Sequence, residues 1–519
     1  MKLAATRWLA GCWLFLAPAP APAPAQIPPP HLDGAQASEL LGRREAILAG
    51  ERSKLLALAA RLRADGKGAE ADQVAPSPTV GPAADGSSRF VPLAEVVAAS
   101  PKKSPGIPGR EAIRAEAALA LFDLAGRAAT APEPAFAFAD DCLRAVLERQ
   151  PDHANSRRLL GFLPRVGGWA TPYAAELLAR GSVADPAFGW VPADWVAHLR
   201  RGELPAPKPA ANRWLPAAEA DALRREWGKG WQIPTEHFEI TTNVPLADAI
   251  SFGRKLENLH QLFFALMADV IGRDQLPLAQ RFRTPDLKPT VSKKPRHRVY
   301  YFATRAEYAR NLAPFQGEQA KVSLGTYLPK KESKAPFGIS YFFNDAGGQL
   351  DVTATLYHEA SHQLLFESAG PDDYTQNVGN YWVFEGLGTY FETLQVEPDG
   401  SLRVGGLVGP RIAQARARLI ANREFVPTEQ FVGLGKARFQ GKEGDGVIYL
   451  HYAEAMTLAV FLMQAREGKY REGFLDYVRD AYKGQFRRGG GRTLEARIGV
   501  RYPDLDGELL DYLAAKPAP

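Results

Sequence analysis

The chain has 519 residues, a net charge of +5 at pH 7 and only two cysteines. So small a positive charge does not indicate nucleic-acid binding, and two cysteines cannot build a disulfide framework or a cysteine metal site. A chain of this length is expected to form two or three domains with ordinary hydrophobic cores.

The first 25 residues are typical of a secretory signal peptide. Two basic residues, Lys2 and Arg7, flank the start of an apolar run that is followed by a small-residue tract ending at Ala25. The run is too short and too interrupted by proline to span a membrane. We therefore expect a signal peptide at 1–25 and an extracytoplasmic protein, periplasmic or secreted. The alternative is a lipoprotein cleavage box with a lipid anchor at Cys12.

Two N-terminal regions precede the part of the chain that carries the motifs. Residues 26–110 are expected to hold an amphipathic helical pair at 38–75 and then a linker rich in Pro, Gly and Ala. Residues 111–212 are expected to form a mainly helical module, with one tetratricopeptide-like helix–turn–helix between Phe138 and Leu163. The module is a structural appendage or a surface for a protein partner.

Residues 213–519 are expected to form one α+β domain. β-Rich segments alternate with helical stretches up to the HEASH motif, and from Leu407 the pattern is almost wholly helical. The expected strands are His237–Thr242, Arg298–Phe302 and Ala335–Asn344, and the helices between them are at about 246–270 and 305–312. This predicts a small sheet lobe followed by a helical lobe.

The segment Thr353–Phe366 contains the sequence HEASH, which matches HExxH. Residues four apart lie on one face of a helix, so His358 and His362 can reach one zinc ion, and Glu359 can reach a water on that ion. HExxH arises by chance in roughly one chain in a hundred of this length, so the motif alone does not establish a zinc site.

A third ligand is expected from the apolar segment Asn380–Glu392. Glu385 lies 23 positions after His362, far enough for the chain to reverse and form a second helix. A carboxylate in such apolar surroundings is costly to bury without a partner, and a metal ion removes that cost. Glu392, two turns further along, is the alternative ligand.

HExxH followed by W-V-F-E-G-L-G-T-Y resembles the gluzincin metallopeptidases, the thermolysin and aminopeptidase N superfamily. The pattern is also similar to an uncharacterised group of bacterial extracytoplasmic gluzincin-like proteins. The resemblance covers roughly residues 236–485 and is strong around 353–393. It implies that His358, His362 and Glu385 bind zinc, that Glu359 is the general base, and that the site lies between the two lobes.

A third segment, Tyr449–Met463, resembles the Y-x-K-G-a helix of the aminopeptidase N branch, whose tyrosine donates to the oxyanion. The resemblance places Tyr452 in that role, although Glu454 and the alanine after it replace Lys-Gly. A packed core tyrosine is the alternative interpretation of Tyr452, and Tyr449 and His451 are alternative donors.

The resemblance also implies that the strand Ala335–Asn344 is the sheet edge along which an extended substrate lies. The G-A-M-E-N stretch of the aminopeptidases, whose Glu binds the substrate amine, is absent, and the nearest upstream carboxylate is Glu332. Aminopeptidase activity is therefore unsupported, and exo- or endo-cleavage stays open.

These observations predict zinc-dependent hydrolysis of peptide bonds in a peptide or protein substrate, with one Zn²⁺ per chain. The alternative is an extracytoplasmic interaction protein whose peptidase-like domain is not catalytic, but the intact Glu359 argues against it. A structural zinc site would need four protein ligands. Side chains that could orient the imidazoles are Glu367, Asp372 and Asp373.

Overall fold

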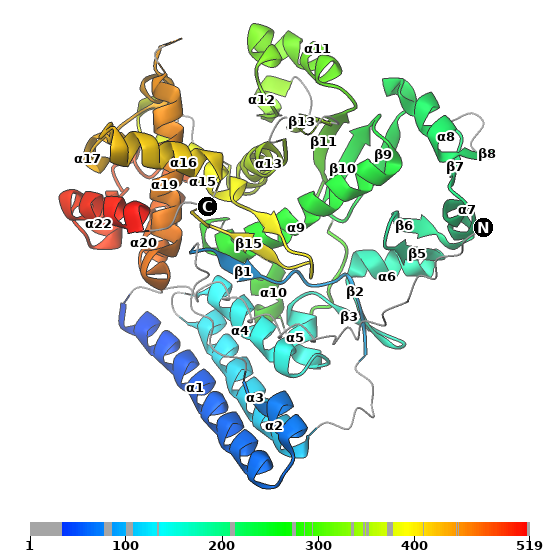
Figure 1. Cartoon of the computed structure of the whole chain (residues 1–519), viewed down its shortest axis with the longest axis vertical. Helices are drawn as coiled ribbons and strands as arrows, with labels where there is room; N and C mark the ends of the chain where they lie inside the picture. The colour runs from blue at the N-terminus through cyan, green and yellow to red at the C-terminus, as the bar shows by residue number, and fades with distance from the viewer. Residues whose placement is uncertain are drawn as a thin grey trace, which may run out of the picture.

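The computed structural model describes residues 34–76, 86–99, 107–131, 134–207, 213–271, 277–284, 286–292, 294–333, 337–345, 348, 352–370, 377–407, 409–442, 444 and 446–515. The fold is mixed α+β, as expected (Figure 1). The expected signal peptide and Cys12 lie outside the described residues.

A five-stranded sheet forms the centre of the motif-bearing part, in the order β12-β13-β11-β10-β9. The three inner strands are parallel, and each edge strand is antiparallel to its neighbour. The strands are β9 (Trp231–Pro234), β10 (Phe238–Thr242), β11 (His297–Phe302), β12 (Thr326–Leu328) and β13 (Ile339–Phe343). Helices α9 (Leu246–Ile271) and α11 (Arg305–Gln316) connect successive parallel strands, α9 together with the shorter α10 (Pro277–Arg283).

The expectation that Ala335–Asn344 forms the edge of the sheet was wrong. Every residue of β13, which lies in this segment, is buried, and β12 covers its outer side through the Tyr327–Ser340 pairing. The actual edge strand, β12, has only three residues and therefore leaves too short an alternating pattern to predict from sequence.

Three helices carry the sequence motifs and pack against one another next to the sheet. They are α13 (Val352–Ala369), α15 (Tyr381–Glu392) and α19 (Val447–Gly468). α15 packs against both α13 and α19, and nearly all of its residues are buried. Its apolar side chains therefore belong to the large hydrophobic core that joins the sheet to the C-terminal helices.

Short helices complete the C-terminal part, which lies on the opposite side of α13 from the sheet (Figure 1). A π-helix at Arg416–Ala421 continues α16. The others are α16 (Pro410–Ala415), α17 (Thr428–Phe431), α18 (Lys436–Gln440), α20 (Arg471–Tyr482), α21 (Leu494–Ile498) and α22 (Tyr502–Ala515), whereas the short helix α12 (Lys330–Ser333) lies beside the sheet, between β12 and β13 in the chain.

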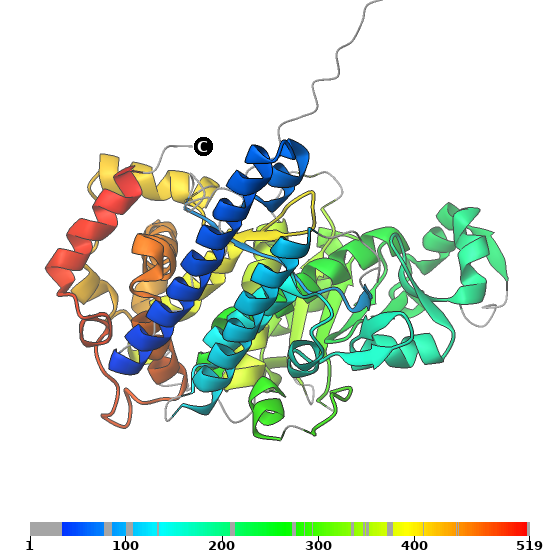
Figure 2. The ribbon, with the colours of Figure 1, turned by 90° about the horizontal axis from the view of Figure 1, so that it is seen from below.

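The N-terminal helices pack onto the motif-bearing part. α1 (Gly34–Ala64) and α3 (Pro108–Thr130) run side by side, with α2 (Gly68–Val74) at one end (Figure 2). α4 (Phe136–Arg149) and α5 (Ala154–Leu159) follow one another where a helix–turn–helix was expected, but α5 ends before Leu163, which begins strand β3. Their core includes Ala268 of α9 and Ala279 of α10, so these helices share an apolar interface with the motif-bearing part.

Short strands occupy much of the region that was expected to be linker or helix. β1 (Ser88–Phe90) joins β14 (Gln395–Val396) and β15 (Leu402–Val404) in one sheet, across more than 300 residues of chain. The hairpin of β7 (Glu203–Pro205) and β8 (Trp214–Pro216) spans the boundary expected between 212 and 213. The remaining short elements are β2 (Val96–Ala98), β3 (Leu163–Arg165), β4 (Gly168–Ala170), α6 (Pro172–Ala179), β5 (Ser182–Asp185), β6 (Gly189–Pro192), α7 (Val196–Arg200) and α8 (Ala217–Arg224), with 3-10 turns at Ala193–Trp195, Trp227–Lys229 and Gly317–Lys321.

In the part of the chain that the structure describes, one helical segment, Val447–Arg466 of α19, is long and apolar enough to cross a membrane. Most of its surface is buried inside the protein, and core helices meet the same criterion of length and composition. α19 is therefore a helix of the hydrophobic core.

Candidate metal centre

α13 presents its two histidines to one point. His358 and His362 are one turn apart, their rings are nearly perpendicular at 83°, and their Nε2 atoms are 3.1 Å apart. The helix ends at Gly370, whose φ of 64° is a left-handed conformation that glycine adopts without strain. The predicted helix and its histidine spacing are both observed.

Glu385 of α15 supplies the third donor at the same point. Its Oε2 atom lies 3.3 Å from Nε2 of His358 and 3.7 Å from Nε2 of His362. This oxygen is buried but makes no hydrogen bond of normal geometry. Burial opposes ionisation of Glu385, but the two imidazoles outweigh it and hold the pKa of Glu385 well below its usual range. The carboxylate is therefore charged, and its Oε2 atom faces the two Nε2 atoms without a hydrogen bond of its own.

The three donor atoms fit a tetrahedral zinc ion. Zn–N and Zn–O bonds of roughly 2.0–2.1 Å place tetrahedral ligand atoms about 3.3 Å apart. The observed separations of 3.1, 3.3 and 3.7 Å surround this value. Two imidazoles and one carboxylate are also the ligand set of zinc sites that keep one position open for water.

Glu392 is not placed as the third ligand but behind His358. Its Oε1 atom lies 2.8 Å from Nδ1 of His358, and Arg411 of α16 holds both of its oxygens at 2.7 and 3.0 Å. A carboxylate on Nδ1 fixes the ring orientation and directs the lone pair of Nε2 toward a metal. Burial opposes protonation of His358, but Glu385 and Glu392 outweigh it and raise the pKa of His358 to about 10 in the metal-free protein.

The two glycines of the E-G-L-G sequence provide room for close packing. A Cβ at Gly388 would lie 2.7 to 2.9 Å from ring atoms of His358, and one at Gly386 would lie 3.1 Å from the carbonyl oxygen of Ala455 on α19. Gly388 thus leaves the space that the His358 ring occupies, and Gly386 lets α15 and α19 approach.

Glu359 sits between the histidines and the edge of the sheet. Its Oε2 atom accepts a hydrogen bond of 2.9 Å from the backbone N–H of Tyr327 in β12. Burial raises the pKa of Glu359, while His358 and His362 partly offset that rise. A raised pKa suits a carboxylate that must take up a proton near neutral pH.

Two tyrosines approach Glu385 from the helical side. Burial and the charge of Glu385 raise the pKa of Tyr452 well above its usual range, and also raise the pKa of Tyr381. Both hydroxyls therefore stay protonated and can donate hydrogen bonds. The ring centre of Tyr452 is 6.3 Å from that of His358, and the guanidinium of Arg411 lies 5.2 Å from the Tyr452 ring centre.

Of the three donors considered on α19, Tyr452 is the one at the centre. Tyr449 is 61% exposed, and Nδ1 of His451 donates to the backbone carbonyl of Phe439 in the core. Glu367 forms hydrogen bonds with His297 and with the hydroxyl of Tyr327, rather than with His362. Asp372 and Asp373 lie outside the described residues.

The sequence did not reveal the roles of Tyr381 and Arg411. Tyr381 precedes Glu385 by four residues on the same helix, so helical spacing could have identified it. Arg411 comes from a separate helix after a hairpin, and no sequence spacing predicts its contact with Glu392.

The three donors, Glu359 and the two tyrosines border one large cavity of about 2200 Å³. His358, Glu359, His362, Glu385, Tyr381 and Tyr452 form part of its wall, and β12 contributes Tyr327. The cavity extends along the sheet to side chains of the N-terminal region, which include Glu95, Tyr173 and Trp190.

Comparison with protein families gives one match. Residues 352–483 are similar to a family described as Protein of unknown function (DUF1570). The matched segment begins with α13 and ends just after α20, so it contains the three metal donors and Tyr452. No curated protein matches the chain.

Proposed function

We propose that this protein is a zinc metallopeptidase of the gluzincin type. The observation that carries the proposal is the convergence of His358 Nε2, His362 Nε2 and the unpartnered Glu385 Oε2 beside Glu359, in the wall of a large cavity. The sheet with its antiparallel edge strand and the helices beyond α13 would be the two lobes of that fold.

When bound, zinc would polarise the scissile carbonyl and make water acidic enough to attack near neutral pH. Glu359 would take a proton from the attacking water and transfer it to the leaving amine. Tyr452 would donate its hydroxyl proton in a hydrogen bond to the carbonyl oxygen as negative charge develops there. Glu392 and Arg411 would hold His358 in place throughout.

Strand β12 would orient the peptide. Because it is an edge strand of the sheet and borders Glu359 through Tyr327, an extended substrate could pair with it as an added strand and take over the Tyr327 N–H from Glu359. The substrate would then be a peptide or an unfolded protein segment in the extracytoplasmic space. The N-terminal helical region would border the cavity and limit what enters.

Glu359→Gln tests the proposal directly. The amide keeps the shape of the side chain but cannot accept a proton, so cleavage of a peptide library should fall about 10²–10⁴-fold while the zinc content is unchanged. Glu454→Gln is the matched control, because Glu454 is buried on α19 away from the donor atoms and burial raises its pKa well above the usual range.

Either of two results would contradict the peptidase assignment. A Glu359→Gln variant that cleaves as fast as wild type would remove Glu359 from the reaction. A zinc-loaded wild-type protein that cleaves no member of a diverse peptide library would favour the non-catalytic interaction protein.

A further inference from the structure

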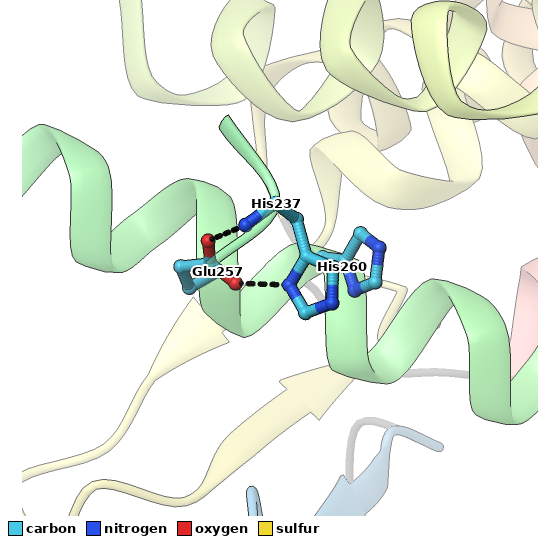
Figure 3. A group of neighbouring side chains, drawn as sticks. All are labelled: His237, Glu257 and His260. Atoms are coloured by element: carbon cyan, nitrogen blue, oxygen red, sulfur yellow. Dashed lines mark hydrogen bonds and ion pairs between the residues drawn. The ribbon is translucent and has the colours of Figure 1, made fainter. Parts of the chain in front are cut away.

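A second group of imidazole and carboxylate side chains lines the same cavity, away from the HEASH motif. It consists of His237, Glu257 and His260, which offer one donor atom each within 4.8 Å of one another (Figure 3). All three are half-buried and lie in the cavity wall. Such a group needs an explanation that the proposed peptidase reaction does not provide.

Two separate elements bring these residues together. Glu257 and His260 are three positions apart on α9, so they lie on one face of the helix, and His237 immediately precedes β10. Glu257 accepts hydrogen bonds from the backbone N–H of His237 at 2.8 Å and from its Nδ1 at 2.7 Å. These bonds hold Nδ1 of His237 and a Glu257 oxygen at hydrogen-bond distance, on the one side of the ring where both can face the same ligand.

His260 has no comparable bond. Its ring stacks on that of His237, with centroids 3.5 Å apart and planes 16° apart (Figure 3). Within the described residues, neither of its ring nitrogens has a hydrogen-bond partner. His260 therefore has ring nitrogens available to a ligand beside the His237–Glu257 pair.

The surroundings are rich in carboxyl groups. Glu236 and Glu95 lie close enough to Glu257 and His237 to act on the charge of His237, and both line the cavity. Three carboxylates around a pair of histidines are stabilised by a cation. Imidazole and carboxylate donors together suit a divalent transition metal.

We propose that His237, Glu257 and His260 bind a second zinc ion on the wall of the cavity. Zinc would take the place of the proton that His237 Nδ1 shares with Glu257, so this pair must open from 2.7 Å to the roughly 3.3 Å of a tetrahedral site, and His260 must turn a ring nitrogen toward the same point. The remaining coordination positions face the cavity and can take water or a carboxylate of a bound molecule. The site stands apart from the peptidase proposal, since no residue is shared.

The test is a zinc count on the full chain, by elemental mass spectrometry after equilibration with buffered free zinc. Wild type should hold two ions per chain, and His260→Gln and His362→Gln should hold one each. His198→Gln is the matched control and should hold two, because His198 pairs with Glu203 in the same way as His237 with Glu257 but lies outside the cavity.

A His260→Gln count equal to that of wild type would overturn the proposal, whatever the wild-type count, whereas a His362→Gln count equal to that of wild type would count against the first centre alone. If His260→Gln does not fold, cobalt titration of wild type replaces it, with visible absorption that should saturate at two equivalents rather than one. Neither readout depends on cleavage, so failure of the second site and failure of the peptidase assignment give different results.

Discussion

The two histidine–glutamate clusters of this protein differ in how their rings are set before any ion binds. His358 and His362 stand nearly perpendicular, and their Nε2 atoms meet the Glu385 oxygen at separations close to those of a tetrahedral site. His237 and His260 instead stack face to face in nearly parallel planes, and Nδ1 of His237 is engaged by Glu257. The first cluster is preorganised for a metal ion, and the second must rearrange.

The cause of this difference lies in the supporting contacts. At the first cluster, a carboxylate held by Arg411 fixes Nδ1 of His358, and Gly388 leaves the space that the ring fills. At the second, Glu257 fixes His237, but His260 is held by stacking. Because reorganisation reduces binding free energy, the first cluster should bind zinc more tightly than the second.

The largest expected effect tests whether chemistry belongs to the first cluster. Tyr452→Phe removes the hydroxyl beside Glu385, and loss of one oxyanion donor lowers kcat about 10²–10³-fold. The zinc content should not change, since Tyr452 is not a ligand. Cleavage kinetics on a peptide substrate check this.

Tyr449→Phe provides the control on the same helix. Tyr449 is exposed, so the Tyr449→Phe variant should cleave the peptide at the wild-type rate. If Tyr452→Phe keeps the wild-type kcat, Tyr452 is a packed core tyrosine and the oxyanion donor must be sought elsewhere, with Tyr381 the next candidate in the cavity wall.

The next effect tests preorganisation. Glu392→Gln removes the charge that orients His358 and weakens the paired hydrogen bonds from Arg411, so the zinc dissociation constant should rise about 10–100-fold. Competition with a chelator of known affinity measures it. Glu424→Gln, which removes a carboxylate paired with Arg418 away from the cavity, should leave the constant unchanged. Equal affinity in both variants would mean that Glu392 does not prepare the site.

The same contrast explains which parts of the molecule the sequence predicts. Residues four apart lie on one face of a helix, so the HEASH sequence alone predicts that His358 and His362 lie close together. The role of Glu385 as the third donor was predicted from the apolar residues around it in the sequence and from the family resemblance. Glu392 was weighed as a ligand, because sequence alone does not determine on which side of the His358 ring a carboxylate two turns further on will lie.

The second cluster follows no such rule. His237 meets α9 only because β10 and α9 pack together, and a spacing of twenty residues between His237 and Glu257 carries no geometric information. The edge strand β12 and the short N-terminal hairpins were missed for a related reason. Strands of three or four residues leave too few alternating positions to distinguish them from loops.

The smallest expected effect separates the two clusters by affinity. A ligand that binds only the folded state at ten times its dissociation constant stabilises that state by about 1.4 kcal/mol. The melting temperature of wild type should therefore rise in two stages as buffered free zinc increases. It should begin to rise at lower zinc, when the first cluster fills, and rise more steeply at higher zinc, when the second cluster also fills. The first stage, at lower zinc, should vanish in His362→Gln, and the second, at higher zinc, should vanish in His260→Gln. A reversed order would mean that the stacked rings bind zinc more tightly than the perpendicular ones. Ring geometry would then not determine zinc affinity, even if both sites exist.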